Sequence, residues 1–70
     1  MEKFKLRPND EFIRLGQLLK ATGMAENGGD AKSIILDGLV KVNGEVETRR
    51  GRKLYPGDTA CFEEQEITIE

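Results

Sequence analysis

Histidine and tryptophan are absent from this chain, and cysteine occurs once, as Cys61. A single cysteine cannot form an internal disulfide, and a chain without histidine cannot build the usual Cys/His zinc sites. The lack of histidine also removes the side chain that most often transfers protons near neutral pH. No serine or cysteine lies beside an evident base in a known catalytic motif. The sequence therefore predicts a protein that is not an enzyme and that requires no metal or other cofactor.

Long apolar runs are also missing. None approaches the roughly 20 residues that a membrane-spanning helix needs, and charges interrupt the N-terminus, unlike a secretion signal. We expect no membrane partner and a cytoplasmic location, which the lone thiol also favours. No linker or repeat divides the sequence, so residues 1–70 are expected to form one domain with a small core.

The charges are unevenly distributed, although the net charge is only −2. Residues 1–31 contain five basic and five acidic side chains and carry no net charge. Residues 32–53 contain six basic and three acidic side chains, a net charge of +3. Residues 54–70 contain five acidic side chains and no basic one, a net charge of −5. A local basic block can hold phosphates and orient a small domain toward a polyanion. Blocks of like charge are also common on solvated surfaces, so charge alone leaves both readings open.

The apolar pattern predicts a strand followed by two helices. Alternation at residues 3–6 indicates the strand, which ends at Pro8, and Asn9 or Asp10 is placed to cap the first helix. Gly23 is placed to end that helix. One apolar stripe on it contains Phe12, Leu15, Leu18 and Leu19.

A second helix is expected from about residues 27–30 to Asp37, with Gly38 supplying its end. Its buried face contains Ala31, Ile34 and Ile35. Leu36 lies off this face, and the pattern leaves open whether Leu36 packs on the following hairpin or is exposed.

After the second helix the apolar period changes to two, and Asn43-Gly44 is a strong signal for a tight hairpin turn. A strict two-residue turn would pair Val42 with Glu45 and Lys41 with Val46. Both pairs mix an apolar and a charged partner, so the pattern favours an irregular register or a wider turn and does not decide between these two.

Several short strands are expected to complete the chain. Lys53-Leu54 suggests one strand, and Tyr55-Pro56-Gly57-Asp58 fits a type II turn. A terminal hairpin with its turn at Glu64-Gln65 would place four apolar residues on one buried face, with Phe62 opposite Ile67 and Ala60 opposite Ile69. The predicted fold class is α+β, with two short packed helices and a small, mostly antiparallel sheet of short strands.

The candidate binding residues are mainly cations, because arginine forks onto phosphate and lysine acts as a point charge. They are Lys32 on the second helix and Lys41, Arg49, Arg50, Arg52 and Lys53 on or after the hairpin. Gly28-Gly29 exposes backbone N–H groups where a phosphate could bind, although a flexible helix start with Asp30 as counter-charge explains the same pattern. Asn43 is expected to shape this surface or donate hydrogen bonds. Since aromatics are few, the pattern favours structured RNA recognised by shape and backbone.

These segments resemble a known family, the S-four RNA-binding domain, named for ribosomal small-subunit protein four. The resemblance rests on Gly38-Leu39-Val40-Lys41-Val42-Asn43-Gly44-Glu45, Arg50-Gly51-Arg52-Lys53-Leu54 and Pro56-Gly57-Asp58. Residues 27–32 and the arginine-rich block are similar to its small stand-alone bacterial subgroup. The resemblance implies an L-shaped unit of two helices and a hairpin that binds structured RNA, often ribosomal or transfer RNA, across the second helix and the adjoining loop.

Two positions depart from the family pattern. Many members carry Arg-Leu-Asp in the first helix, where this chain has Arg14-Leu15-Gly16, and many carry Ser-Arg before the second helix, where it has Gly28-Gly29. The missing arginine removes a usual phosphate contact, whereas Lys32 matches a position that is typically basic. We expect the later cations to compensate, namely Arg49, Arg50, Arg52 and Lys53.

We therefore predict a stand-alone, monomeric RNA-binding module whose partners are ribosomal or transfer RNA, and beyond them the ribosome or its assembly proteins. The alternative is a protein-interaction module that engages basic ribosomal or assembly proteins through the acidic C-terminal stretch. Partners that are retained after nuclease treatment would favour the alternative.

Overall fold

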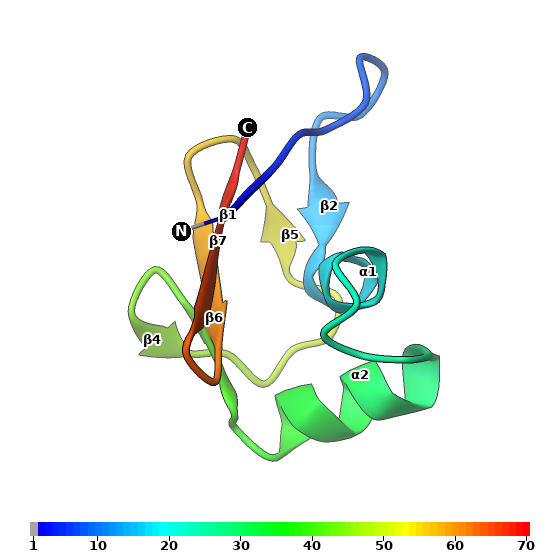
Figure 1. The fold of residues 1–70 in the computed structure, drawn as a ribbon, viewed down its shortest axis with the longest axis vertical. Helices are drawn as coiled ribbons and strands as arrows, with labels where there is room; N and C mark the ends of the chain where they lie inside the picture. Colours follow the sequence, from blue (N-terminus) through cyan, green and yellow to red (C-terminus); the bar gives the residue numbers. More distant parts are fainter. Residues whose placement is uncertain (1) are drawn as a thin grey trace.

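The chain forms the predicted strand, two short helices and series of short strands, together with a two-residue strand before the first helix that the pattern did not predict. The computed structural model describes residues 2–70. In chain order the elements are β1 (Glu2–Phe4), β2 (Ile13–Arg14), α1 (Leu15–Ala21), α2 (Gly28–Leu36), β3 (Val40–Val42), β4 (Glu45–Val46), β5 (Lys53–Leu54), β6 (Thr59–Phe62) and β7 (Gln65–Ile69) (Figure 1). The predicted α+β class is confirmed.

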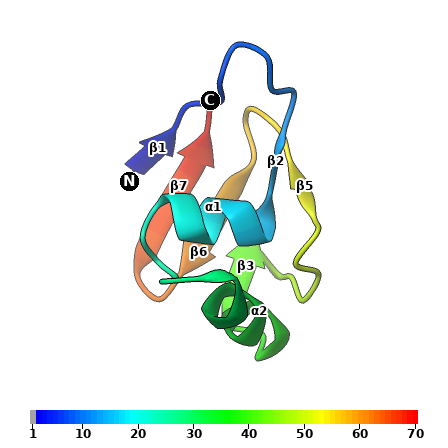
Figure 2. The same cartoon turned by 90° about the vertical axis from the view of Figure 1, so that its right-hand side faces the viewer.

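The strands form two separate sheets. The larger has five strands in the order β1-β7-β6-β3-β4, in which only the β1–β7 pair is parallel among the described residues. The smaller is a two-stranded antiparallel ribbon of β2 and β5. Both helices lie on the same side of the larger sheet, and the β2–β5 ribbon stands beside α1 (Figures 1 and 2). The helices and the ribbon thus form a second layer against one face of the sheet.

The core lies between these layers and contains most of the predicted apolar stripes, with Phe12 and Ile34 only partly buried. Its largest fully buried side chains are Leu15, Leu18, Leu19, Ile35, Val40, Leu54, Ile67 and Ile69. Because side chains alternate along a strand, Val40 and Val42 face the helices while Lys41 faces away. This alternation leaves the outer face of the larger sheet in solvent.

The start of the first helix differs from the prediction. Neither Asn9 nor Asp10 caps it, since α1 begins at Leu15 with Arg14 at the N-cap. Pairing with β5 holds Ile13 and Arg14 extended, and this tertiary contact overrides the helical pattern. Phe12 therefore precedes the helix and is only half buried.

The second helix agrees with the prediction. The Asn27 side chain caps α2 by accepting a hydrogen bond of 3.0 Å from the Asp30 N–H. Gly38 ends α2 with a φ of 75°, a left-handed conformation that favours glycine. Leu36 is 58% exposed, which settles the alternative that the sequence left open.

The first hairpin has the strict two-residue turn, and not the irregular register or wider turn that the mixed pairs suggested. Lys41 pairs with Val46 and Val42 with Glu45, and the turn residues Asn43-Gly44 have φ values of 52° and 86°. The mixed pairs are tolerated because β4 is an edge strand whose two residues are both exposed. Glu45, the charged partner of Val42, therefore stays in solvent.

The turn of the terminal hairpin was predicted one residue too late, which shifts the pairing partners by two residues. The turn is Glu63-Glu64, and Ala60 pairs with Ile67 rather than with Ile69. A shift of two residues leaves every side chain on its predicted face, because side chains alternate with a period of two. Ala60, Ile67 and Ile69 are accordingly buried as expected.

Asn43 ties two turns together and is expected to stabilise the fold. Its Nδ2 donates to Asp58 Oδ1 at 3.1 Å, and its Oδ1 accepts from the Thr59 N–H at 2.9 Å. Asn43→Ala removes both bonds and leaves alanine at a positive φ. We expect the free energy of unfolding, measured by urea denaturation, to fall by about 1–3 kcal/mol. Asn9→Ala, in an exposed loop, is the control and should change the free energy of unfolding little. Equal losses in the two variants would contradict a stabilising role for Asn43.

Candidate nucleic-acid interface

A shallow, positively charged depression lies where α1, the start of α2 and the β4–β5 loop (residues 47–52) meet. It has a volume of about 310 Å³ and is called the basic groove below. Its lining residues are Arg14, Gly16, Gln17, Lys20, Gly28, Ala31, Arg50 and Gly51. Three cations from two distant segments of the chain therefore share one depression.

The polar face of α1 forms one wall of the basic groove. Arg14, Gln17 and Lys20 follow each other at three-residue spacing and are all exposed, while the opposite face of α1 packs into the core. The Arg14 Nη1 donates a hydrogen bond of 2.9 Å to the Gly51 carbonyl. This bond links the wall to the β4–β5 loop.

The β4–β5 loop packs closely against α1 because residue 16 is glycine. The Gly16 N–H donates to the Arg50 carbonyl at 3.0 Å, and the Leu15 N–H donates to the Arg52 carbonyl at 2.9 Å. A Cβ atom on Gly16 would lie only 2.7 Å from the Arg50 Cγ. The departure from the family's Arg-Leu-Asp pattern thus allows Arg50 to lie directly against the helix.

A buried acid holds the β4–β5 loop in shape. Glu47 is 6% exposed and accepts hydrogen bonds from Arg49 Nε at 3.0 Å, Arg49 Nη2 at 2.9 Å and Arg52 Nη1 at 2.7 Å. The bonds from Arg49 and then Arg52 lower the pKa of Glu47 from 4.5 to about 2. Two guanidinium groups against one carboxylate leave the cluster a net charge of +1.

The predicted binding residues are divided among three places. Arg50 and Gly28 line the basic groove, and Gly29 is the exposed residue beside Gly28. Arg49, Arg52 and Lys53 line a neighbouring depression of about 470 Å³ with Gly51 and Tyr55. Since Gly51 lines both depressions, the two are adjacent.

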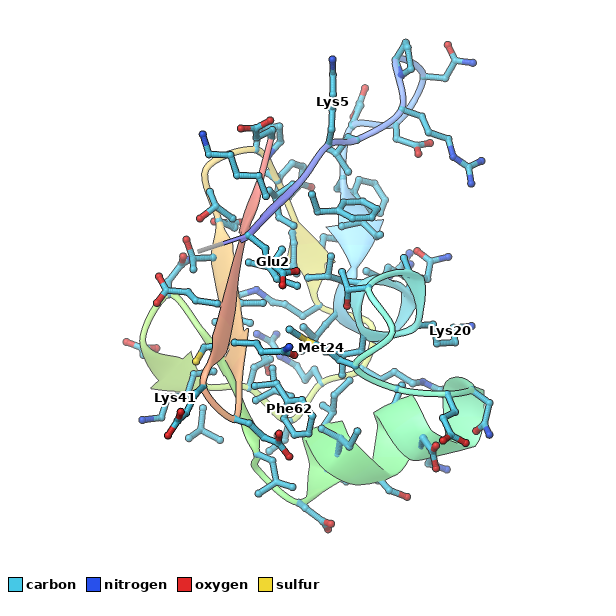
Figure 3. All side chains as sticks on the ribbon, viewed as in Figure 1. Glu2, Lys5, Lys20, Met24, Lys41 and Phe62 are labelled. Atoms are coloured by element: carbon cyan, nitrogen blue, oxygen red, sulfur yellow. The ribbon has the colours of Figure 1, made fainter. Side chains whose placement is uncertain are left out.

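The remaining predicted residues lie elsewhere. Lys32 is exposed on α2, next in sequence to Ala31 of the basic groove. Lys41 lies on the outer face of the larger sheet, and Figure 3 shows Lys41 and Lys20 on opposite sides of the molecule. Asn43 has both polar side-chain atoms engaged in the hydrogen bonds to Asp58 and Thr59. Asn43 therefore shapes the turn, and no measured contact assigns Lys32 or Lys41 to the groove.

Arg14 and Lys20 are not among the binding residues that the sequence predicts. Their spacing with Gln17 marks the polar face of the first helix, a signal that was available from the sequence. A polar helix face is usually only a solvated surface, and nothing in the sequence indicates that the loop carrying Arg50 packs beside it. The close approach of Arg50 to Gly16 shows that this helix face borders a second cationic segment and is more than a solvated surface.

The acidic residues do not gather into a cation site. Among residues 2–70, no three acidic or cysteine side chains are close enough together to hold a metal ion. Glu63, Glu64 and Glu66 are exposed at the end of the β6–β7 hairpin. Within the same described part of the chain, no helix is long and apolar enough to cross a membrane.

Comparison with known proteins adds independent information to this geometry. A family model described as the S4 domain matches residues 4–70. The "Probable ribosome maturation protein RlbA" of Bacillus subtilis (strain 168) is 47% identical over 53 residues, which cover 76% of this chain and 75% of that protein. YbcJ of Escherichia coli (strain K12) is 40% identical over 57 residues, 81% of each chain.

The solution structure of YbcJ from E. coli superposes on this fold with a TM-score of 0.70. The two chains are 38% identical, and the match covers 99% of this chain and 86% of YbcJ. That structure is described as revealing an alfaL motif involved in RNA-binding.

The close contact between Gly16 and Arg50 predicts that Gly16→Ala destabilises the protein. The added Cβ must displace Arg50, at an overpacking cost of about 1–3 kcal/mol, which the helix propensity of alanine offsets by up to about 1 kcal/mol. We expect a net loss of about 1–2 kcal/mol in urea denaturation. Gly28→Ala is the matched control, because no heavy atom lies within 4 Å of its added Cβ. A Gly16→Ala protein as stable as Gly28→Ala would show that the contact is not tight.

The Glu47 cluster predicts a loss of stability in acid. The folded-state pKa of Glu47, about 2, is below the ordinary value of 4.5. The stabilisation is therefore fully present above about pH 4.5 and disappears as the pH falls toward 2. Because Arg49 is largely exposed, solvent screens its attraction to Glu47. We therefore expect the free energy of unfolding to fall by only about 1–2 kcal/mol over this pH range.

Denaturation at several pH values should show this loss in the wild type and a flatter profile in Glu47→Gln. The stability difference between the two proteins should narrow as the pH decreases from 4.5 to 2. Glu64→Gln, which changes an exposed acid, should keep the shape of the wild-type profile. A constant difference between wild type and Glu47→Gln would show that the carboxylate is not the stabilising group.

Proposed function

From the premise that this chain belongs to the S4 domain family, we propose that it is a non-catalytic protein that binds structured RNA, ribosomal or transfer RNA, through the basic groove and the cations beside it. The family resemblance expected from the sequence is thereby confirmed. The detailed contacts and the RNA target are our proposal.

The convergence of cations in the basic groove carries this proposal. Arg14 at the N-cap of α1, Lys20 on α1 and Arg50 on the β4–β5 loop line the groove together with Gly28 at the first turn of α2. Arginine and lysine both bind phosphate, and the positive end of a helix adds to the attraction. The groove is shallow, so it suits an RNA backbone better than an enclosed small molecule.

Cations outside the groove extend the proposed surface. Lys53 and the Glu47 cluster, with its net charge of +1, lie in the adjacent depression, and Lys32 follows on α2. We propose that Lys32, Arg49, Arg50, Arg52 and Lys53 bind phosphates as the sequence suggests, with Arg14 and Lys20 added. Lys41 on the outer sheet face is assigned to a peripheral contact.

The ribosome is the proposed setting. The name of the B. subtilis relative refers to ribosome maturation, and shape-based recognition of folded RNA suits such a role. We accordingly propose ribosomal RNA as the first target to test, with the protein acting as a monomer in the cytoplasm.

A second candidate function is binding of a basic ribosomal or assembly protein through the β6–β7 hairpin. Glu63, Glu64 and Glu66 form no ion pair within residues 2–70, so their charges are available to a partner. A pull-down after nuclease treatment separates the two functions. Basic partners that remain without RNA, and that are lost when the three acids are changed to glutamine, would favour this candidate.

Salt dependence of RNA binding tests the main proposal. Contacts to four or five phosphates predict a slope of about −3 to −4 for log affinity against log salt, with the single-strand coefficient as a guide. The double variant Lys20→Gln/Arg50→Gln should reduce this slope by about 1.4 and weaken binding about tenfold or more to many sequences. Fluorescence anisotropy with a ribosomal RNA fragment measures both quantities.

The matched control removes the same charge from outside the proposed surface. Lys3→Gln/Lys5→Gln changes two exposed lysines of the N-terminal segment, and neither lines the basic groove or the adjacent depression. We expect this control to retain most of the affinity. A flat salt response in the wild type, or equal losses in the two double variants, would exclude the basic groove as the RNA site.

A further inference from the structure

The outer face of the β2–β5 ribbon combines aromatic and cationic side chains. Arg14 pairs with Lys53, and Ile13 pairs with Leu54. Because side chains alternate, the inner pair Ile13 and Leu54 packs toward the core while Arg14 and Lys53 are exposed. Phe12 and Tyr55 lie two residues from the exposed pair and continue the same face.

These side chains are in direct contact. The ring centroids of Phe12 and Tyr55 are 5.7 Å apart with an interplanar angle of 52°. Lys53 Nζ lies 4.9 Å and Arg14 Cζ 5.6 Å from the centroid of the Phe12 ring. Phe12 is therefore covered by two cations and supports Tyr55 from one side.

Tyr55 leaves much of its own ring open to solvent. It is 46% exposed, and of the four large exposed hydrophobic residues within 2–70 it alone is aromatic, the others being Leu36, Leu39 and Val46. Its backbone is held at both ends: the Tyr55 N–H donates to Asp58 Oδ2 at 2.8 Å, and its carbonyl accepts from the Asp58 N–H at 2.9 Å. The ring is thus presented on a well-ordered turn.

The position of Tyr55 connects it to the proposed RNA surface. Tyr55 and Lys53 line the depression next to the basic groove, together with Arg49, Gly51 and Arg52. The Tyr55 ring contacts Phe12, over which Arg14 and Lys53 lie. An exposed aromatic ring with cations nearby can stack a base while a neighbouring cation binds the phosphate.

We propose that Tyr55 is a stacking site for one unpaired nucleobase in the depression adjacent to the basic groove, with Lys53 of the same depression binding the phosphate of that nucleotide. This inference rests on the proposed function, because it assigns a subsite on the same RNA surface. It specifies the substrate further: a structured RNA with an unpaired nucleotide next to a helix, such as a bulge or an end. A single ring suits a single base, in agreement with the scarcity of aromatics in the chain.

Two probes test the stacking site: a blunt RNA duplex and the same duplex with one unpaired 2-aminopurine nucleotide at its end. For the wild type we expect about tenfold tighter binding of the second probe, together with quenching of its fluorescence. Tyr55→Leu should abolish the gain and the quenching, yet leave the affinity for the blunt duplex and the salt slope unchanged. Tyr55→Phe should retain both effects, because the ring remains.

The outcomes separate this inference from the function on which it rests. If the wild type binds both probes equally and without quenching, or if Tyr55→Leu keeps the gain, the stacking site is wrong while RNA binding stands. If neither probe nor ribosomal RNA is bound, the proposed function itself fails and the subsite with it. Lys53→Gln provides a further check, since loss of a phosphate contact should weaken binding of the overhanging probe and lower its salt slope by about 0.7.

Discussion

The candidate interface depends on one buried carboxylate. Glu47 accepts hydrogen bonds from Arg49 and Arg52. Its own N–H donates to the Val40 carbonyl at 2.9 Å, so the β4–β5 loop starts from a point fixed on the larger sheet. The loop then reaches α1, where the N–H groups of Leu15 and Gly16 donate hydrogen bonds to its carbonyls. Without this acid, three arginines within four residues would repel each other and extend into solvent.

The same arrangement explains how an acidic protein can bind a polyanion. The basic groove is lined by residues of β2, α1, α2 and the β4–β5 loop, whereas Glu63, Glu64 and Glu66 lie on the β6–β7 hairpin. Charges of opposite sign on different parts of a small domain orient its approach to RNA, and a net charge of −2 does not prevent this. The proposed stacking by Tyr55 would add a short-range contact that salt affects less.

Local signals predicted much of the fold. Some signals act only on backbone groups close to them in the chain, so they were recognisable without tertiary information. They are Asn27 and Gly38 at the ends of α2 and the Asn43-Gly44 turn. The buried face of the terminal hairpin was also predictable, because a register error of two residues does not change which side chains face the core. The start of α1 was not predictable, because it depends on the pairing of Ile13 with Leu54, two residues far apart in the chain.

The site itself was only partly predictable. The sequence alone determined that a basic block follows a tight turn and that this block includes Arg50 and Lys53, because charge and turn chemistry are properties of consecutive residues. Only the tertiary structure decided which cations share a surface: it placed Arg14 and Lys20 beside Arg50, engaged Arg49 and Arg52 with Glu47, and set Lys41 on the far face of the sheet. The physical reason is that convergence depends on long-range packing, here the close approach of the loop to Gly16, which no local pattern of residues encodes.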